Sequence, residues 1–201
     1  FTAIQIAELP GAEEGAPIAF CTKRPVLILA ATTVPSAMIF DICSAWMARK
    51  AAFIRVPLGL QRATLAFTDA VGAVAPDLLR ALTMAYWEKE DTLQFQKAIS
   101  ESSVVVVNGS DETVQAVATL CTDVPMVAHG SRRSIAVANS EELLQPTWGE
   151  FCRGLALDVV LWAQRGCTSP TVLFVVGKGA LYMAACAELD AAIESQRIAF
   201  G

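Results

Sequence analysis

The sequence of 201 residues predicts an α/β protein with a doubly wound parallel sheet, and three observations support this fold class. Short β-branched and apolar runs alternate with helical patterns along most of the chain. Hydrophobic residues make up 54% of the chain and the mean hydropathy is +0.48, which strands buried on both faces of a parallel sheet explain. Residues 26–56 form a strand–helix–strand unit, whose strands must run parallel with a right-handed crossover. We therefore expect helices on both faces of the sheet.

The first part of the chain supplies the first two strands of this sheet. Both are β-branched or apolar runs, as buried strands are. The elements expected in order are a loose loop over 1–25 with an edge strand at its end, a strand over 26–31, a turn over 32–35, a helix over 36–49 and a strand over 51–56. One side of the helix is predicted to be apolar through Ile39, Ile42, Cys43, Trp46 and Met47.

The alternation continues to residue 176. Its clearest strand is the uninterrupted β-branched run over 104–107. The elements expected are one or two helices over 60–82 broken near Pro76, a short strand over 84–87, a helix over 92–100, the strand over 104–107, a helix that ends at Leu120, strands over 126–128 and 134–138, a helix that begins at Pro146 and Thr147 and ends at Gly166, and a strand over 171–176.

Cys167 lies in the short stretch between the last predicted helix and the last predicted strand. Pro170 stiffens the exit from this stretch. A thiol in a loop held between two hydrophobic elements can be aimed at a substrate, as a nucleophile must be. The alternative is the usual role of a cysteine, a small buried hydrophobic residue, which we expect for the other five cysteines.

Composition excludes several classes of function. The net charge is −5, the isoelectric point is near 4.9 and there is no run of Lys or Arg, so we expect no nucleic-acid partner. No apolar run reaches the length of a membrane span, so we expect no integral membrane segment. We also expect no signal peptide. Because the first residue is Phe rather than Met, we expect the sequence to be part of a longer chain.

The cysteines and the single histidine argue against a metal site. The six cysteines form no C-x-x-C pair and have no metal-ligand spacing. His129 is the only histidine, so a structural zinc site is not expected. A chain of this size with a large core does not need a disulfide framework, so we expect reduced thiols and a cytoplasmic location.

Three turns lie at predicted strand ends, where ligands bind in open parallel sheets: 32–35, the stretch after Arg55, and 108–112. Gly109 and Ser110 stand between a strand and a helix, where backbone N–H groups and the helix dipole attract an anion. The same pair is also an ordinary helix cap. Arg55 ends a predicted strand and could contact a phosphate or a ribose, with a surface cation as the alternative.

Three longer stretches carry a family resemblance. They are 107–114 (VNGSDETV), 129–134 (HGSRRS) and 158–170, which ends in QRGCTSP. Together with the TTVP turn and the strand that ends in Arg55, they resemble the aldehyde dehydrogenase superfamily, and in particular its acyl-CoA reductase branch of the LuxC type. The likeness covers most of residues 23–176. It implies an aldehyde dehydrogenase-like fold, with a Rossmann-like dinucleotide-binding domain over 1–128 and part of a second, catalytic α/β domain over 129–201.

The resemblance also implies roles for individual residues. Cys167 corresponds to the family's nucleophile. Gly109, Ser110 and Glu112 correspond to its dinucleotide motif. Arg55 falls where the superfamily commonly has a lysine near the adenosine ribose. The implied cofactor is NADPH, with NADH as the alternative.

Two positions depart from the superfamily's pattern. Pro35 matches an Asn-x-Pro turn, but Thr33 replaces the asparagine that donates to the oxyanion, and a threonine hydroxyl can donate in its place. His129 replaces the glutamate with which hydrolytic members activate water. The missing carboxylate fits a reductase, which must avoid hydrolysis, and His129 could deprotonate Cys167 or shuttle a proton. The alternative is a histidine that only hydrogen-bonds at a strand end.

We therefore expect an enzyme that reduces a fatty acyl thioester to the aldehyde through a cysteine thioester. Its partners would be fatty acyl-CoA or an acyl carrier thioester, and other copies of the chain in an oligomer. Two alternatives remain open. One is a non-catalytic binding or assembly subunit with the same fold, and the other is a sister reductase that acts on an acyl phosphate.

Overall fold

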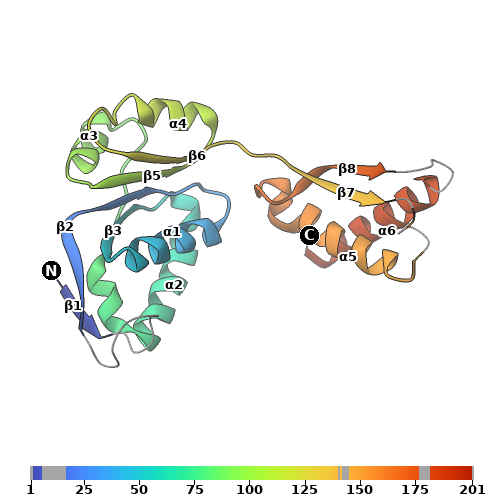
Figure 1. Cartoon of the computed structure of the whole chain (residues 1–201), viewed down its shortest axis with the longest axis horizontal. Coiled ribbons are helices and arrows are strands. Elements are labelled where there is room, and N and C mark those ends of the chain that lie inside the picture. Colours follow the sequence, from blue (N-terminus) through green and yellow to red (C-terminus); the bar gives the residue numbers. More distant parts are fainter. Residues whose placement is uncertain (1, 6–16, 140, 142–144, 177–181, 201) are drawn as a thin grey trace. The chain divides into compact units, whose positions relative to one another are not determined.

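The chain divides into two compact units, Phe1–Ser131 and Arg132–Gly201 (Figure 1). The computed structural model describes residues 2–5, 17–139, 141, 145–176 and 182–200. Each unit has its own sheet and its own helices. His129, which the sequence analysis assigned to the second domain, lies in the first unit. The functional labels given to residues 1–128 and 129–201 remain predictions.

The first unit contains a parallel sheet with the strand order β4-β3-β2-β5-β6. All four neighbouring pairs of strands on this path are parallel. A further strand, β1 (Thr2–Gln5), pairs antiparallel with the first part of β2. The five parallel strands are β2 (Pro17–Leu29), β3 (Lys50–Arg55), β4 (Leu82–Ala85), β5 (Val104–Asn108) and β6 (Met126–His129).

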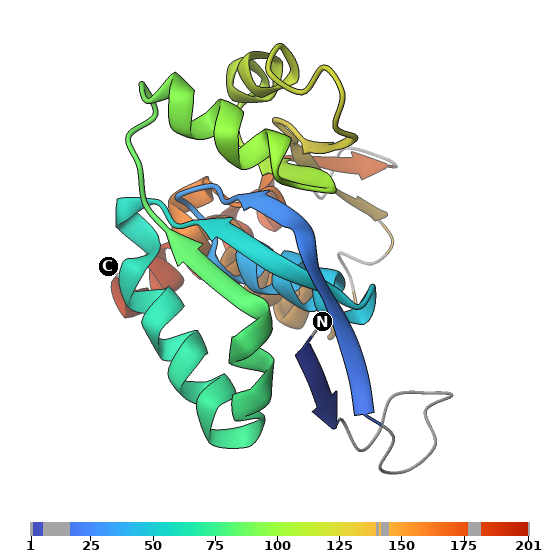
Figure 2. The ribbon, with the colours of Figure 1, turned by 90° about the vertical axis from the view of Figure 1, so that its left-hand side faces the viewer.

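Helices cover both faces of this sheet, so the predicted doubly wound α/β fold is confirmed (Figures 1 and 2). The helices α1 and α2 lie on one face, and α3 and α4 lie on the other. Their bounds are α1 (Pro35–Met47), α2 (Gln61–Val74), α3 (Thr92–Ser100) and α4 (Asp111–Ala118), and two short 3₁₀ helices occupy Leu58–Leu60 and Pro76–Ala81.

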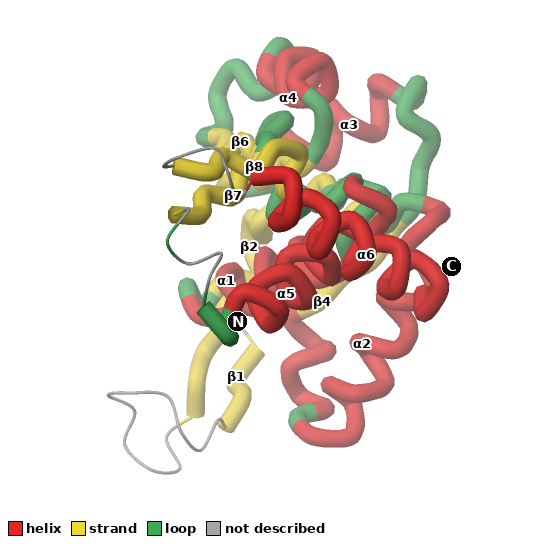
Figure 3. The backbone as a smooth tube through the Cα atoms, turned by 90° about the vertical axis from the view of Figure 1, so that its right-hand side faces the viewer, coloured by secondary structure: helices red, strands yellow, loops and turns green. Residues whose placement is uncertain are grey.

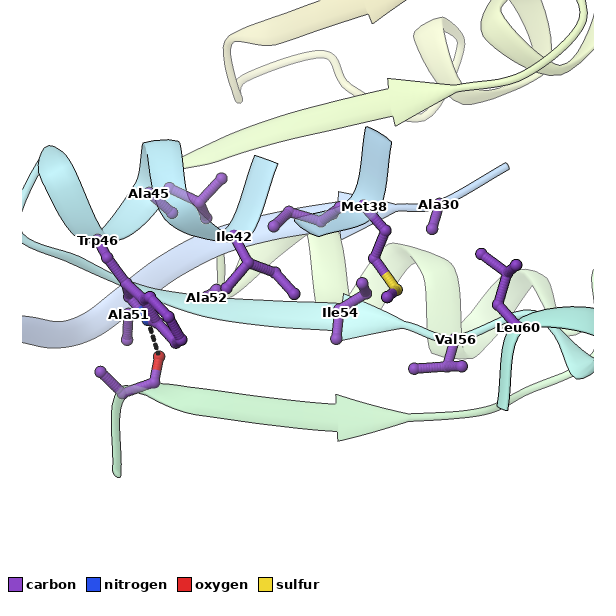
Figure 4. Close-up of a cluster of buried hydrophobic side chains, with 13 residues drawn as sticks. Ala30, Met38, Ile42, Ala45, Trp46, Ala51, Ala52, Ile54, Val56 and Leu60 are labelled. Atoms are coloured by element: carbon purple, nitrogen blue, oxygen red, sulfur yellow. Dashed lines mark hydrogen bonds between the residues drawn. The ribbon is translucent and has the colours of Figure 1, made fainter. Parts of the chain in front are cut away.

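The strands send alternate residues into two hydrophobic cores, because successive side chains of a strand point to opposite faces. On the face of α1 and α2 the core contains Ile28 together with Ile54 and Trp46, the last two of which are labelled in Figure 4. On the face of α3 and α4 it contains Leu27 and Val105 together with other side chains. This burial on both faces accounts for the apolar composition of the chain.

Helix α1 shows how the apolar pattern relates to burial. Ile42 is fully buried and Trp46 is 8% exposed, and the indole nitrogen of Trp46 donates to the carbonyl of Ala81 at 3.3 Å. Met47, which we placed on the same side, is 65% exposed. That placement is wrong. Met47 follows Ile42 by five residues, which places the two side chains about 140° apart around a helix of 3.6 residues per turn.

The second unit is a two-stranded parallel sheet packed on two helices. Strand β7 (Ser134–Asn139) pairs with β8 (Pro170–Val176). Helices α5 (Trp148–Val160) and α6 (Tyr182–Phe200) lie side by side (Figure 3). Buried Trp148 and Cys152 of α5 form a core with Ala138 of β7. The other face of the sheet is apolar and exposed through Ile135, Val137, Val172, Phe174 and Val176.

Several boundaries differ from the predicted ones. Strand β2 begins at Pro17 rather than at residue 26, because its first part pairs with β1, and residues 6–16 of the predicted loop lie outside the described residues. Strand β4 ends at Ala85, before Tyr86 and Trp87. Helix α5 ends at Val160, and a 3₁₀ helix over Leu161–Gln164 leads toward Gly166. Helix α6 was not predicted from the sequence. Among the helices of the described residues, none has both the length and the apolar character needed to cross a bilayer.

Candidate active site

Cys167 lies on a tight turn that is fastened to strand β7. The turn is closed by the N–H of Ser169, which donates to the carbonyl of Gly166 at 3.1 Å. The hydroxyl of Ser134, the first residue of β7, donates to the carbonyl of Cys167 at 2.6 Å. The Cys167 residue itself is exposed. The backbone of this cysteine is therefore held while its side chain stays accessible, as a nucleophile requires.

The backbone just before this turn is strained. Ala163 has a φ of 51° and Gln164 a φ of 59°, in the left-handed region that costs residues with a side chain roughly 1 kcal/mol or more each. The hydroxyl of Ser169 contacts the carbonyl of Leu161 at 3.4 Å across this segment. Such strain persists only where the surrounding structure enforces it, and it is concentrated at functional sites.

The other cysteines differ from Cys167 in accessibility. Burial raises the pKa of Cys152 to about 11, with the charge of Glu188 as the next cause. Burial also raises the pKa values of Cys43 and Cys121. Of the five cysteines whose side chains the structure describes, Cys167 alone is exposed. The predicted packing role thus fits Cys152, which is in a core.

Thr33 lies in the turn between β2 and α1, at the carboxyl end of a central strand of the sheet. Its residue is half-buried. No hydrogen bond of the Thr33 hydroxyl is found to any residue that the structure describes. The hydroxyl is thus free to donate to a ligand, as an oxyanion donor must be.

Arg55 ends strand β3 and contacts the segment that follows β4. Its Nε and Nη2 both donate to the carbonyl of Trp87, at 3.0 and 2.7 Å. Its guanidinium carbon lies 5.4 to 5.9 Å from the ring centres of Tyr86, Trp87 and Phe95. Arg55 is therefore not a free surface cation, and its cofactor contact remains a prediction. The positive charge stays at the carboxyl edge of the sheet.

Gly109, Ser110 and Glu112 lie at the start of α4. Ser110 caps the helix, because its hydroxyl oxygen accepts the N–H of Thr113 at 3.3 Å. The hydrogen bond from Ser110, followed by one from the backbone of Glu112, lowers the pKa of the Glu112 carboxyl. A Cβ atom at Gly109 would lie 3.0 Å from the side chain of Thr113. The absence of a side chain at Gly109 therefore lets the first turn of α4 pack closely against this strand end.

His129 ends strand β6 beside the end of β5. Asn108 and His129 are register partners, and the N–H of Gly109 donates to the carbonyl of His129 at 3.1 Å. The Asn108 amide donates to the Asp41 carboxylate at 2.6 Å. Asp41 is 8% exposed and interacts electrostatically with His129. Asp41 was not among the predicted site residues, although a charged residue among the apolar positions of α1 is visible in the sequence.

A hydrogen bond joins the segment after β6 to the first turn of α4. The N–H of Ser131 donates to Oδ1 of Asp111 at 2.8 Å. A Cβ atom on Gly130 would lie 2.5 Å from the same oxygen. The segment that leaves β6 is therefore held against the first turn of α4.

The structure thus brings Thr33, Arg55, Gly109, Ser110, Glu112 and His129 into one unit and places Cys167 in the other. Within the first unit, the strand ends that carry these residues belong to neighbouring parallel strands, where ligands bind in open α/β sheets. A site shared by the two units remains a prediction. In the described part of the chain, no group of three His, Cys, Asp or Glu residues could hold a metal ion.

Comparisons with known proteins give a family and a fold. Residues 21–197 match the sequence model of the family described as acyl-CoA reductase (LuxC). Among curated proteins, a search found no match. Solved structures with a similar fold are all distant in sequence, so they show the fold alone.

Three of these structures illustrate the likeness. Proline utilization A from Corynebacterium freiburgense has a TM-score of 0.65 and 13% identity, over 86% of this chain and 18% of that chain. Indole-3-acetaldehyde dehydrogenase AldA from P. syringae, solved with NAD+ and IAA, has a TM-score of 0.63 and 12% identity, over 90% of this chain and 35% of that chain. AldH from Staphylococcus aureus has a TM-score of 0.62 and 16% identity, over 86% of this chain and 37% of that chain. The chain therefore has the aldehyde dehydrogenase fold and spans about a fifth to a little over a third of these structures.

Proposed function

This chain belongs to the acyl-CoA reductase (LuxC) family, and from this premise we propose that it reduces a fatty acyl thioester to an aldehyde through a thioester on Cys167. The observation that carries the proposal is the exposed Cys167 on a turn held by Ser134 and Ser169. The proposed partners are fatty acyl-CoA or an acyl carrier thioester, and further copies of the chain. We place the reaction in the cytoplasm.

The first half-reaction transfers the acyl group to the protein. The Cys167 thiolate attacks the thioester carbonyl, a bond forms between Sγ and the acyl carbon, and the bond to the carrier sulfur breaks. The carrier leaves as a thiol after it takes up a proton. In the tetrahedral intermediate the negative oxygen accepts from the N–H of Cys167 and from the Thr33 hydroxyl. Thr33 is suited to this role because it has no competing hydrogen bond among the described residues.

The second half-reaction reduces the acyl group. A nicotinamide cofactor, NADPH in our proposal and NADH in the alternative, supplies the hydride when it is bound. Gly109 and Ser110 would hold it at the start of α4, where backbone N–H groups and the helix dipole attract an anion. Arg55 and Glu112 would lie near its adenosine part. His129 gives a proton to the oxygen of the reduced carbon and takes it back as the aldehyde forms and Cys167 leaves as the thiolate. The balanced reaction consumes one acyl thioester, one hydride and one proton, and gives one aldehyde and one carrier thiol.

The residue at position 129 favours reduction over hydrolysis. A carboxylate there would activate water against the thioester on Cys167, and the acyl group would be lost as a fatty acid. His129 accepts the N–H of Gly109 through its backbone and leaves its imidazole to proton transfer.

The direct test is acylation of the Cys167→Ser variant. Incubation with radiolabelled acyl-CoA should label the unsubstituted protein and not this variant, because an alcohol lacks the reactive thiolate. NADPH affinity, measured by fluorescence titration, should stay within about twofold, since the change removes no cofactor contact. Cys121→Ser, which alters a half-buried cysteine just after α4, is the matched control and should be labelled normally.

The outcomes separate the alternatives. Label on Cys167→Ser at the unsubstituted level would overturn the nucleophile assignment. Labelling by an acyl phosphate and not by acyl-CoA would identify the sister reductase. If the unsubstituted protein takes up no label from either donor, the non-catalytic binding subunit becomes the better description.

A further inference from the structure

Asp41 is a buried carboxylate that the proposed mechanism does not use. It lies in the middle of α1 and is 8% exposed. Its helical neighbours Met38, Ile42 and Ala45 are buried apolar residues of the core on this face. Desolvation by this burial raises the pKa of Asp41, against smaller lowering effects of Asn108 and His129. A charge in such surroundings costs stability unless a partner offsets it.

The partners of Asp41 come from the ends of two neighbouring strands. On β5, Val105 and Val107 point into the core beneath α3 and α4, so Asn108 points to the opposite face, on which α1 lies. The same alternation on β6, where Met126 packs against the α3 and α4 core, places His129 on the α1 face. Asp41 accepts the Asn108 amide at 2.6 Å there.

His129 is the charged group that acts on Asp41. Among the described residues, the interactions found for the Asp41 carboxyl are the hydrogen bond from Asn108 and the charge of His129. Lys50 and Arg55 of β3 and Arg62 of α2 contribute none. Arg55 lies on the other face of the sheet, over the rings of Trp87 and Phe95. Three elements, α1, β5 and β6, therefore bring one carboxylate, one amide and one imidazole to the same edge of the sheet.

We propose that Asp41 is a positioning residue for His129, whose ring it orients at the carboxyl edge of the sheet. The inference rests on the proposed function, in which His129 transfers a proton during reduction. A carboxylate beside an imidazole can accept a hydrogen bond from one ring N–H and so fix the orientation of the ring. Asn108 fixes the carboxylate, since its amide can donate but does not titrate. A packing role alone would be served better by asparagine at position 41, which accepts the same hydrogen bond without a charge.

The test combines kinetics and stability on four variants. In Asp41→Asn, kcat for acyl-CoA reduction should fall about tenfold with KM nearly unchanged, a smaller loss than removal of the proton-transfer group itself would cause. In the His129→Gln background, Asp41→Asn should change kcat by less than about twofold, because residues that act as a unit are not additive. The melting temperature of Asp41→Asn should stay equal or rise, because the buried charge is gone.

Ser102→Ala is the matched control for a lost buried polar group. Ser102 is fully buried, and its hydroxyl donates to Ala98 at 2.6 Å at the end of α3. This variant should melt at a lower temperature and keep kcat. Two results would overturn the inference. One is an Asp41→Asn variant that melts lower with kcat unchanged, and the other is an equal loss of kcat with and without His129.

A titration separates this inference from the proposed function, because it needs no activity. The carboxyl carbon signal of Asp41 is assigned in ¹³C NMR spectra by its loss in Asp41→Asn. In His129→Gln its titration should move to higher pH, since the charge of His129 lowers the pKa of Asp41. His129 is the only histidine, so no other imidazole can replace it. An unmoved titration would refute the Asp41–His129 coupling even if the protein proved to be an active reductase.

Discussion

At the scale of single residues, the cysteines differ in how readily a reagent reaches them. Cys167 is exposed, whereas Cys152 is buried with a pKa of about 11, so about one Cys152 in a thousand would be a thiolate at pH 8. Iodoacetamide at pH 8 should therefore modify Cys167 before Cys43, Cys121 and Cys152. Peptide mass spectrometry of samples taken over time measures this order.

The same alkylation checks whether the thiol lies in a substrate site. Acyl-CoA added beforehand should slow the modification of Cys167, because the acyl group or its carrier covers the sulfur. Cys167 that reacts later than Cys152 in the folded protein would contradict the described exposure and would weaken the nucleophile assignment.

At the scale of elements, two helices begin with similar caps but are expected to differ in function. Asp91 caps α3 by accepting the N–H of Gln94 at 3.1 Å, and Ser110 caps α4 by accepting the N–H of Thr113 at 3.3 Å. Asp91→Ala and Ser110→Ala should each lower the free energy of unfolding by about 1 kcal/mol, as cap removal generally does. Denaturant unfolding measures both losses.

Cofactor affinity should distinguish the two caps. Ser110→Ala should also weaken NADPH binding by about three- to tenfold, because a lost hydrogen bond is worth about 1 kcal/mol, whereas Asp91→Ala should bind normally. Calorimetric titration with NADPH provides the measurement. Equal affinities in the two variants would assign Ser110 to capping alone.

Elements with a strong local pattern were predictable from the sequence, and elements fixed by distant contacts were less so. The uninterrupted run that became β5 and the helix over 92–100 were predicted within a residue. The first part of β2 was missed because its pairing with β1, rather than an apolar pattern, makes it a strand. Helix α6 was not predicted, since its apolar residues are not gathered on one side.

In the candidate site, too, residues in a local pattern were predicted and contacts between distant residues were not. Gly109 and Ser110 were found because a strand end and a cap lie next to each other in the sequence. Asp41 was missed because its partner Asn108 is 67 residues away. The bond from Arg55 to Trp87 spans 32 residues, and no local pattern reveals that the guanidinium is held by that carbonyl.

At the scale of the whole molecule, the two units differ in how well each could fold without the other. The first has five parallel strands with a hydrophobic core on each face. The second has two strands, and one face of its sheet exposes Ile135, Val137 and Phe174 at 52 to 59%. Two-stranded sheets are marginal in isolation, and an exposed apolar face of this kind favours association.

Separate expression should reveal this difference. Residues 1–131 should unfold in one cooperative transition on heating, whereas residues 132–201 should bind a hydrophobic dye and melt without a sharp transition. Circular dichroism and dye fluorescence measure the two properties. A sharp transition in the second fragment, with no dye binding, would show that α5 and α6 suffice to stabilise its sheet.

The contact between Asp111 and the end of the first unit has an evolutionary consequence. Its carboxylate accepts the N–H of Ser131 and occupies the space that a side chain at Gly130 would need. A mutation at either position is therefore tolerated best together with one at the other. Among homologues, a larger residue at position 130 should accompany a smaller one at position 111. The first residue of α4 and the residue after β6 should therefore vary together.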